Sequence, residues 1–291
     1  MKTGWYHLIA LTIVVIWGTT FISTKLLLAA GLEPDSIFFY RFLLAYTGIW
    51  LFGKPQASLL AKNWKDEGLF LLVGMTGGSL YFLSENNALH YTQASNVALL
   101  VSTAPLMTAL LSHFFSSNEK LNRNVAMGSL IALAGVALVV FNGQCILKIS
   151  PIGDILTLSA AFCWALYTIL LKRIGNRYTT LFITRKVFFY GLLTILPFFL
   201  SNPLKTHLVL FAQPIVWGNL LFLGIGASLL CYFFWNLTVK KLGAVRTTNY
   251  VFIIPLVALI ASSVILDEII TLVAIFGALL ILAGIVLAER R

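Results

Sequence analysis

Charged side chains are scarce in this chain of 291 residues. Only 10% of its residues are Asp, Glu, Lys or Arg, while 59% are hydrophobic. Soluble domains carry about 25% charged and about 45–50% apolar residues. Ten acids and twenty bases cannot cover the surface of a water-soluble globule of this length. This scarcity excludes a soluble enzyme or a soluble nucleic-acid-binding domain, and it predicts an integral membrane protein.

Cysteine and clusters of metal ligands are scarce as well. The three cysteines, Cys145, Cys163 and Cys231, have no regular spacing with the four histidines. This pattern predicts no disulfide framework, no metal site and no cofactor. No Walker-type phosphate loop occurs in the chain, which argues against an ATP-driven pump.

Long apolar runs fill the chain instead. A membrane helix needs roughly 20 apolar residues, and runs of about that length alternate with short polar stretches. The first run is too long for the apolar part of a secretory signal, so we interpret it as a span. Ten spans are predicted, at 7–29, 36–53, 68–88, 94–116, 124–142, 152–173, 179–200, 214–239, 245–266 and 270–288.

The basic residues indicate how these spans are oriented. Fourteen of the twenty bases fall at the two termini and in the even-numbered loops, whereas the odd-numbered loops hold only Lys148 and Lys205. Because membrane proteins concentrate Lys and Arg in cytoplasmic loops, both termini are predicted to be cytoplasmic. The net charge of +10 is therefore interpreted as a topology signal and not as a sign of a nucleic-acid partner.

The two halves of the chain resemble each other at an offset near 150 residues. The run 128–139 aligns with 277–288 and is identical at six of twelve positions. Rare residues also recur in the same order: Trp17 and Trp164, Lys25 and Lys172, Arg41 and Arg185, Asn86 and Asn236, Pro105 and Pro255, Glu119 and Glu268. This repeat predicts two domains, 1–145 and 146–291.

Each half holds five predicted spans, and this odd number means that the second half enters the membrane upside down relative to the first. Inverted repeats are the build of many secondary transporters, whose substrate site lies near the midplane between the repeats. The predicted fold is an all-α membrane protein with ten transmembrane helices in two inverted five-helix repeats.

Several motifs carry a family resemblance. In the first half they are Trp17–Phe21 (WGTTF), Tyr40–Ala45 (YRFLLA), Ala88–Ser95 (ALHYTQAS), Pro105, Glu119–Leu121, Gly128 and Gly135. The second half repeats a looser version with Pro255, Asp267, Glu268, Gly277 and Gly284, and lacks the full RFLLA string at Arg185. Over essentially its whole length, the chain resembles EamA-type carriers of the drug/metabolite transporter superfamily.

The resemblance implies a ten-helix bundle in which the first, third, fourth, sixth, eighth and ninth helices line a central cavity. It implies that the fifth and tenth helices form a peripheral pair. Bacterial relatives commonly export amino acids and other small metabolites. We therefore expect a secondary transporter, not an enzyme, in the bacterial inner membrane, which exports amino acids or related small metabolites by alternating access. The expected partners are a small-molecule substrate and the lipid bilayer, with a homodimer left open.

Two alternatives stay open for the function. A flippase for a lipid carrier would share the small multi-span architecture, but it would need a lateral opening lined by apolar and basic residues. A membrane-embedded enzyme acting on lipid-linked substrates would be expected to show clusters of carboxylates or histidines, and the sequence shows none.

Ten polar or aromatic side chains inside the spans are the candidate substrate-binding residues. They are Trp17, Thr20, Tyr81, Glu85, Asn86, Trp164, Tyr167, Tyr232, Asn236 and Tyr250. Glu85 is the sharpest candidate because a carboxylate inside a span is costly and usually faces a cavity or a partner. It could bind a substrate amine, carry a proton, or reach water at the headgroups. For each single aromatic residue, plain helix packing remains the commoner role.

Four further residues are candidates for gating or for helix kinks. Arg41 and Arg185 could gate or bind a substrate carboxylate, although an anchor at the helix end is the favoured interpretation. Pro105 and Pro255 each remove a backbone hydrogen bond and are expected to kink their spans. The glycine stripe of Gly128, Gly135, Gly277 and Gly284 is predicted to be structural, either between the fifth and tenth helices or at a dimer surface.

Overall fold

The computed structural model describes residues 3–52, 59–92, 94–115, 122–141, 150–201, 210–211, 213–266 and 270–289. The regular elements in these ranges are all helices. Those of the first half are α1 (Thr3–Ala29), α2 (Pro34–Phe52), α3 (Trp64–Gly74), the π-helix η1 (Met75–Ser79), α4 (Leu80–Tyr91), α5 (Ala94–Val101), α6 (Ala104–Phe115) and α7 (Arg123–Phe141).

The second half repeats this order of α-helices and π-helix and adds two short 3₁₀ turns. It contains α8 (Pro151–Ile174), the 3₁₀ turn η2 (Gly175–Arg177), α9 (Thr180–Ser201), α10 (Pro214–Leu221), the π-helix η5 (Phe222–Leu230), α11 (Cys231–Leu242), α12 (Ala244–Asn249), the 3₁₀ turn η6 (Tyr250–Ile253), α13 (Ile254–Leu266) and α14 (Leu272–Glu289). Cys145, Glu119, Glu268 and many of the predicted loop charges lie outside the described residues.

Helices occupy all ten stretches that the sequence analysis predicts as spans. Eight of them are long and apolar enough to cross a membrane, and α2 and α14, of 19 and 18 residues, occupy the other two stretches. The third stretch begins earlier than predicted, at Trp64 instead of residue 68. The protein is therefore an all-helical, multi-pass membrane protein.

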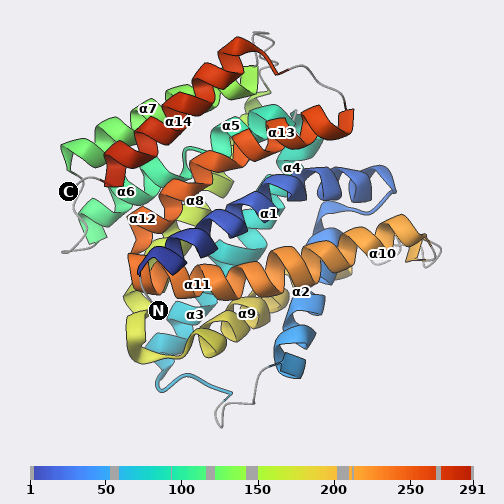
Figure 1. The fold of residues 1–291 in the computed structure, drawn as a ribbon. Coiled ribbons are helices and arrows are strands. Elements are labelled where there is room, and N and C mark those ends of the chain that lie inside the picture. Colours follow the sequence, from blue (N-terminus) through green and yellow to red (C-terminus); the bar gives the residue numbers. More distant parts are fainter. Residues whose placement is uncertain are drawn as a thin grey trace.

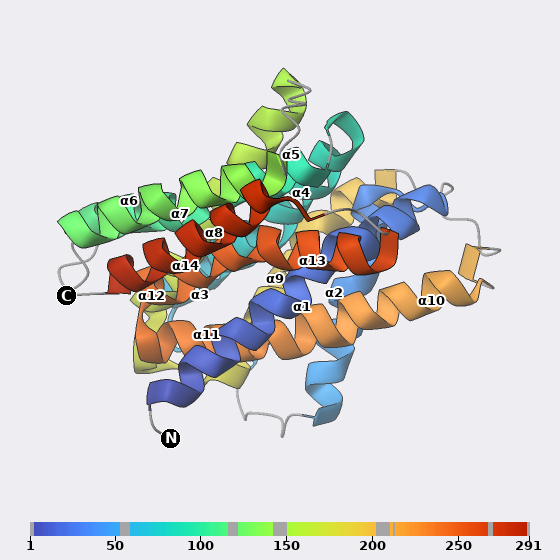
Figure 2. The same cartoon turned by 45° about the horizontal axis from the view of Figure 1, so that its top comes forward.

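Most helices lie side by side along one direction (Figure 1). The start of α1 and the end of α14 lie at the same end of the bundle, which we call the terminal end (Figures 1 and 2). Helices of the two halves interleave: α1 contacts α11 and α13, α8 contacts α4 and α6, and α3 contacts α9. A site in the middle of the bundle is therefore built by both halves.

The pair of α7 and α14 lies at one edge of the bundle (Figures 1 and 2). Glycine permits their close approach: a Cβ added to Gly128 would lie 2.5 Å from the carbonyl oxygen of Gly284, and one added to Gly135 would lie 2.6 Å from that of Gly277. Of the two predicted roles for the glycine stripe, contact between the fifth and tenth helices is the one that the structure confirms.

Four spans are interrupted near the middle of the bundle. The third and eighth spans contain the π-helices η1 and η5, which sit at corresponding places in the two halves. The ninth contains the 3₁₀ turn η6, and the fourth breaks between α5 and α6. Such interruptions free backbone groups from the helical ladder and often mark functional positions.

Candidate functional site

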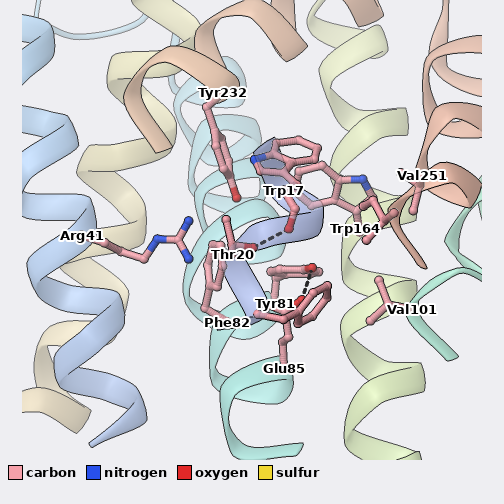
Figure 3. Close-up of a pocket in the computed structure, with 12 residues that line it drawn as sticks. Trp17, Thr20, Arg41, Tyr81, Phe82, Glu85, Val101, Trp164, Tyr232 and Val251 are labelled. Atoms are coloured by element: carbon pink, nitrogen blue, oxygen red, sulfur yellow. Dashed lines mark hydrogen bonds between the residues drawn. The ribbon is translucent and has the colours of Figure 1, made fainter. Parts of the chain in front are cut away.

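A cavity lies in the middle of the bundle, with walls from both halves of the chain (Figure 3). The space there that no protein atom occupies amounts to about 490 Å³, solvent-connected space included. The lining side chains are Trp17, Thr20, Phe21, Arg41, Tyr81, Phe82, Glu85, Val101, Trp164, Tyr232, Val251 and Ile254. Eleven of them come from the first, third, fourth, sixth, eighth and ninth spans, the ones that the family resemblance implies as cavity-lining. The twelfth, Arg41, comes from the second span.

Trp17 is the centre of an aromatic wall. Its ring centroid lies 4.9 Å from that of Trp235, 5.1 Å from that of Trp164 and 6.1 Å from that of Tyr232. Its indole N–H donates a hydrogen bond of 3.0 Å to the carbonyl oxygen of Ala227 in η5, which fixes the ring orientation. Rigid rings from α1, α8 and α11 suit an apolar or aromatic group of a ligand.

Arg41 brings a positive charge to the cavity wall from α2. The side chain is buried, its Nε donates to the hydroxyl of Ser228 at 3.0 Å, and the guanidinium carbon lies 4.3 Å from the centroid of the Phe82 ring. The guanidinium group points toward the middle of the cavity (Figure 3). Two of its nitrogens, Nη1 and Nη2, are the groups that bind a carboxylate or phosphate in the bidentate manner.

Glu85 brings a carboxylate to the same cavity from α4. It is buried, and its Oε1 accepts a hydrogen bond of 2.5 Å from the hydroxyl of Tyr81, one helical turn earlier (Figure 3). This contact orients the carboxylate and leaves Oε2 available. Among the ion pairs of the described residues, none joins Glu85 to Arg41. The cavity therefore presents a cation and an acid that do not neutralise each other by direct contact.

Two other polar groups of the wall bind the protein itself. The hydroxyl of Tyr232 donates to the carbonyl oxygen of Gly77 in η1 at 2.7 Å, and that of Thr20 donates to the carbonyl oxygen of Trp17 at 2.7 Å. A Cβ at Gly77 would lie 2.3 Å from the ring of Tyr167, so only glycine allows this approach of η1 to α8. The π-helix thus fixes the position of a cavity tyrosine.

A layer of buried side chains separates the cavity from the terminal end. We call Tyr167, Thr184, Trp235 and Asn236 the closing layer; each is 3% exposed or less. The hydroxyl of Tyr167 donates to the Asn236 side-chain oxygen at 2.5 Å, and the Asn236 amide donates to the Thr184 hydroxyl at 2.9 Å. Since α8 and α11 run toward the terminal end (Figure 1), the closing layer lies about one turn nearer that end than the cavity residues of these helices.

The structure brings six of the ten candidate substrate-binding residues to the cavity, namely Trp17, Thr20, Tyr81, Glu85, Trp164 and Tyr232. The other four lie elsewhere. Tyr167 and Asn236 belong to the closing layer. The amide of Asn86 donates to the carbonyl oxygen of Pro34 at 3.2 Å, and the hydroxyl of Tyr250 lies 2.6 Å from Nδ1 of His7.

The four candidates for gating or helix kinks also lie in different places. Arg41, for which the sequence favoured an anchor, lines the cavity, whereas the guanidinium carbon of Arg185 lies 5.0 Å from the ring centroids of both Trp50 and Phe182 and is not among the lining residues. Pro105 follows directly on the break between α5 and α6, and Pro255 follows η6. Each proline thus stands just after an interruption of its span.

A cluster of charges that the sequence does not predict lies at the terminal end of the bundle. Asp66 and Glu67 are buried in the first turn of α3 and form ion pairs with Arg177 and Lys186. Both acids precede the predicted third span, which begins at residue 68, and Arg177 is one of the bases in the even-numbered loops. Asn63 is the residue in the sequence that could have indicated the earlier start of this helix. Its side chain caps α3 by accepting a hydrogen bond of 2.8 Å from the backbone N–H of Asp66.

Two tyrosines complete this charged cluster. Tyr190 donates to Glu67, and Tyr178 donates to Asp66 at 2.7 Å. Tyr178 lies between two spans, where burial and then the hydrogen bond to Asp66 raise the pKa of its hydroxyl, so it stays a donor at neutral pH. The backbone carbonyl of Tyr178 also accepts from Nζ of Lys240 at 2.9 Å. The charged cluster ties α3 to α9 and to the α8–α9 connection, outside the cavity.

Comparisons with known proteins agree with this architecture. A crystal structure has the same fold, with a TM-score of 0.76 and 19% identity over 98% of this chain and 96% of that chain. An "Uncharacterized transporter" of Archaeoglobus fulgidus is 30% identical over all of this chain and 99% of its own length. A "Probable amino-acid metabolite efflux pump" of Escherichia coli is 26% identical over 95% of this chain and 92% of its own.

The family comparison covers both halves of the chain. The EamA-like transporter family matches residues 4–141 and again residues 151–289. Among the described residues, no group of three or more His, Cys, Asp or Glu side chains is placed to hold a metal ion. The cavity, with its walls from both repeats, lies within these two matches. The chain belongs to the EamA-like transporter family and is a membrane transporter.

Proposed function

We propose that this protein is a secondary transporter of the bacterial inner membrane that exports amino acids or related small metabolites by alternating access. The observation that carries the proposal is the pair of Arg41 and Glu85, two buried side chains of opposite charge on the wall of one cavity. Buried charges inside membrane spans are costly and mark substrate or ion pathways. The relative named as an amino-acid metabolite efflux pump supports the same substrate class.

The proposed topology has ten spans in two inverted repeats, 1–145 and 146–291, with cytoplasmic termini. It is supported by the bases at the termini and in the even-numbered loops. The common location of the start of α1 and the end of α14 (Figure 1) agrees with an even number of spans. On this assignment, the terminal end of the bundle faces the cytoplasm.

Alternating access is supported by the position of the cavity relative to the closing layer. Glu85 lies one turn beyond Tyr81 on α4, away from the terminal end, while Asn236 and Tyr167 fill the space on the other side. A cavity that is closed toward one end is one of the two states that such a mechanism needs. In the proposed topology, this state is closed toward the cytoplasm.

The flippase alternative has less support in the cavity. A lipid carrier with a phosphate headgroup would be expected to meet several basic side chains, and Arg41 is the one base among the twelve lining residues described. The carboxylate of Glu85 would repel such a headgroup. A membrane-embedded enzyme lacks the expected carboxylate or histidine cluster among the described residues.

The test is transport by the purified protein in proteoliposomes. Counterflow would be measured with a panel of labelled amino acids and sugars, with and without a pH gradient, next to protein-free liposomes. We expect counterflow of one or more amino acids, and we expect Glu85→Gln to change the rate or its pH dependence. Correctly folded protein that moves no member of the panel would refute the proposal, and movement of a lipid-linked sugar instead would favour the flippase.

A further inference from the structure

Two charged side chains of the cavity are already held in place by the protein before any ligand binds. Arg41 is fixed by its bond to Ser228 and by the ring of Phe82 below its guanidinium. Glu85 is fixed by the hydroxyl of Tyr81. Groups that are held in this way lose little freedom when a ligand arrives, so their charges are available at low entropic cost.

The wall beside these two charges is mostly apolar and aromatic. Trp17 and Trp164 stand at 87° to each other with ring centroids 5.1 Å apart, and Val251 and Ile254 from the second repeat complete this part of the wall. Figure 3 shows Arg41 on one side of this space, the Tyr81–Glu85 pair below it and the tryptophan rings above. A ligand that fits all three parts has an anionic group, a cationic group and an apolar body.

We propose that the cavity recognises free, zwitterionic α-amino acids with an apolar side chain, through Arg41 for the carboxylate and Glu85 for the ammonium group. The apolar side chain packs against Trp17 and Trp164. This inference rests on the proposed function and narrows its substrate class. It excludes amines, carboxylic acids and N-acylated amino acids as good ligands, because each lacks one of the two charges.

The selectivity follows from the cost of leaving a buried charge without a partner. An amine leaves the guanidinium of Arg41 unpaired, and a carboxylic acid leaves Glu85 unpaired, in an environment where neither reaches bulk water easily. Sites built to bind a polar group reject analogues that lack it by up to about 10⁴–10⁵-fold. The cavity retains solvent-connected space, so we expect a smaller discrimination, of at least about tenfold per missing group.

The test is equilibrium binding to the purified full-length protein, with three ligands that share one apolar body. L-Phenylalanine has both charges, phenethylamine lacks the carboxylate, and 3-phenylpropionate lacks the ammonium group. The quenching of tryptophan fluorescence would give each affinity. For the wild-type protein, we expect phenylalanine to bind at least about tenfold more tightly than either analogue. Equal affinity for all three ligands, or no binding of phenylalanine, would overturn the inference.

Two charge variants assign the groups to the residues. Glu85→Gln should lose the preference for phenylalanine over 3-phenylpropionate and keep its preference over phenethylamine. Arg41→Gln should lose the preference for phenylalanine over phenethylamine and keep its preference over 3-phenylpropionate. If Arg41→Gln does not fold, Arg41→Lys, which keeps the positive charge, takes its place. Arg185→Gln is the matched control, since it removes the repeat-related arginine outside the cavity and should preserve both preferences. If neither cavity variant alters a preference, Arg41 and Glu85 are not the recognition groups.

These outcomes also separate the inference from the proposed function. Counterflow of a sugar, with no binding of phenylalanine, would overturn the zwitterion site and leave the protein a transporter. Selective binding of phenylalanine, without counterflow of any amino acid, would support the site and contradict export.

Discussion

The contact between α7 and α14 offers the sharpest test of how the bundle is held together. Gly135 faces Gly277, and a Cβ added to Gly135 would lie 2.6 Å from the carbonyl oxygen of Gly277 and 2.7 Å from the backbone nitrogen of Ile281. Both neighbours are backbone atoms of a helix, which cannot rotate away as a side chain can. We predict that Gly135→Val destabilises the protein by separating the two helices.

The expected size of the effect follows from these distances. Ordinary contacts of a Cβ begin near 3.4 Å, so the helices must move apart by about 1 Å, and gaps of ~0.5–1 Å forfeit a quarter to a half of each dispersion contact. Overpacking of this kind costs about 1–3 kcal/mol. A valine also adds two methyl groups to the bare Cβ, which places the expected loss at about 2–3 kcal/mol.

Unfolding in mixed detergent micelles, followed by tryptophan fluorescence, would measure this loss. The matched control is Gly218→Val in α10, because a Cβ at Gly218 meets nothing within 4 Å; its effect should stay within about 0.5 kcal/mol. Equal stability of the two variants would refute the argument that close backbone approach holds α7 to α14.

Three further predictions concern the charged cluster, the closing layer and η1. Lys186→Met should lower the free energy of unfolding by about 1.5–3 kcal/mol, the contribution of a hydrogen bond to a charged group. Tyr190 and the backbone N–H of Ala61 still donate to Glu67, and adding Glu67→Gln should recover most of the loss in the same assay. Asn236→Ala removes two side-chain hydrogen bonds and should speed amide hydrogen exchange in the terminal-end half of α8. Unchanged exchange would contradict the role of Asn236 in holding the closing layer together. Gly77→Ala should lower counterflow per folded protein, because its Cβ would lie 2.3 Å from the ring of Tyr167.

The sequence predicts the spans and much of the cavity because two strong signals exist. Apolar runs of membrane length mark each helix, and the spacing of rare residues between the halves points to the cavity tryptophans, Trp17 and Trp164. What the sequence could not resolve is the direction in which neighbouring residues point. Glu85 and Asn86 differ by one position, about 100° around a helix, and only Glu85 faces the cavity while Asn86 turns to α2.

This failure has a physical cause in the composition of the spans. In a soluble helix, a polar stripe against an apolar face shows which residues point inward. In α4 the polar residues at 84–87 are consecutive, so they point to all sides of the helix and leave no single polar side to set its phase. A second ambiguity concerns depth along the helix: Tyr232 lies in the cavity, and Asn236, on the same face one turn further along α11, lies in the closing layer.

The charged cluster was missed for a different reason. Hydropathy ends a predicted span at the first charged residues, so the predicted third span begins at residue 68, just after Asp66 and Glu67. In the structure, their pairing with Arg177 and Lys186 lets α3 begin at Trp64 and keep both acids buried. A single sequence does not show which distant base will neutralise a given acid. A span that begins with buried, paired acids therefore cannot be predicted from one sequence.

The repeat-related asparagines show how a symmetric scaffold becomes directional. Asn236 makes two side-chain hydrogen bonds, to Tyr167 and Thr184, whereas Asn86 makes one, to the backbone of Pro34. Identical repeats would give the two states of an alternating-access cycle equal free energies, so any preference must come from such differences. A net hydrogen bond contributes about 0.5–1.5 kcal/mol, and a difference of ~1.4 kcal/mol changes an equilibrium tenfold. In the proposed alternating-access cycle, one additional bond on the terminal side would favour the state closed toward that end by roughly two- to tenfold.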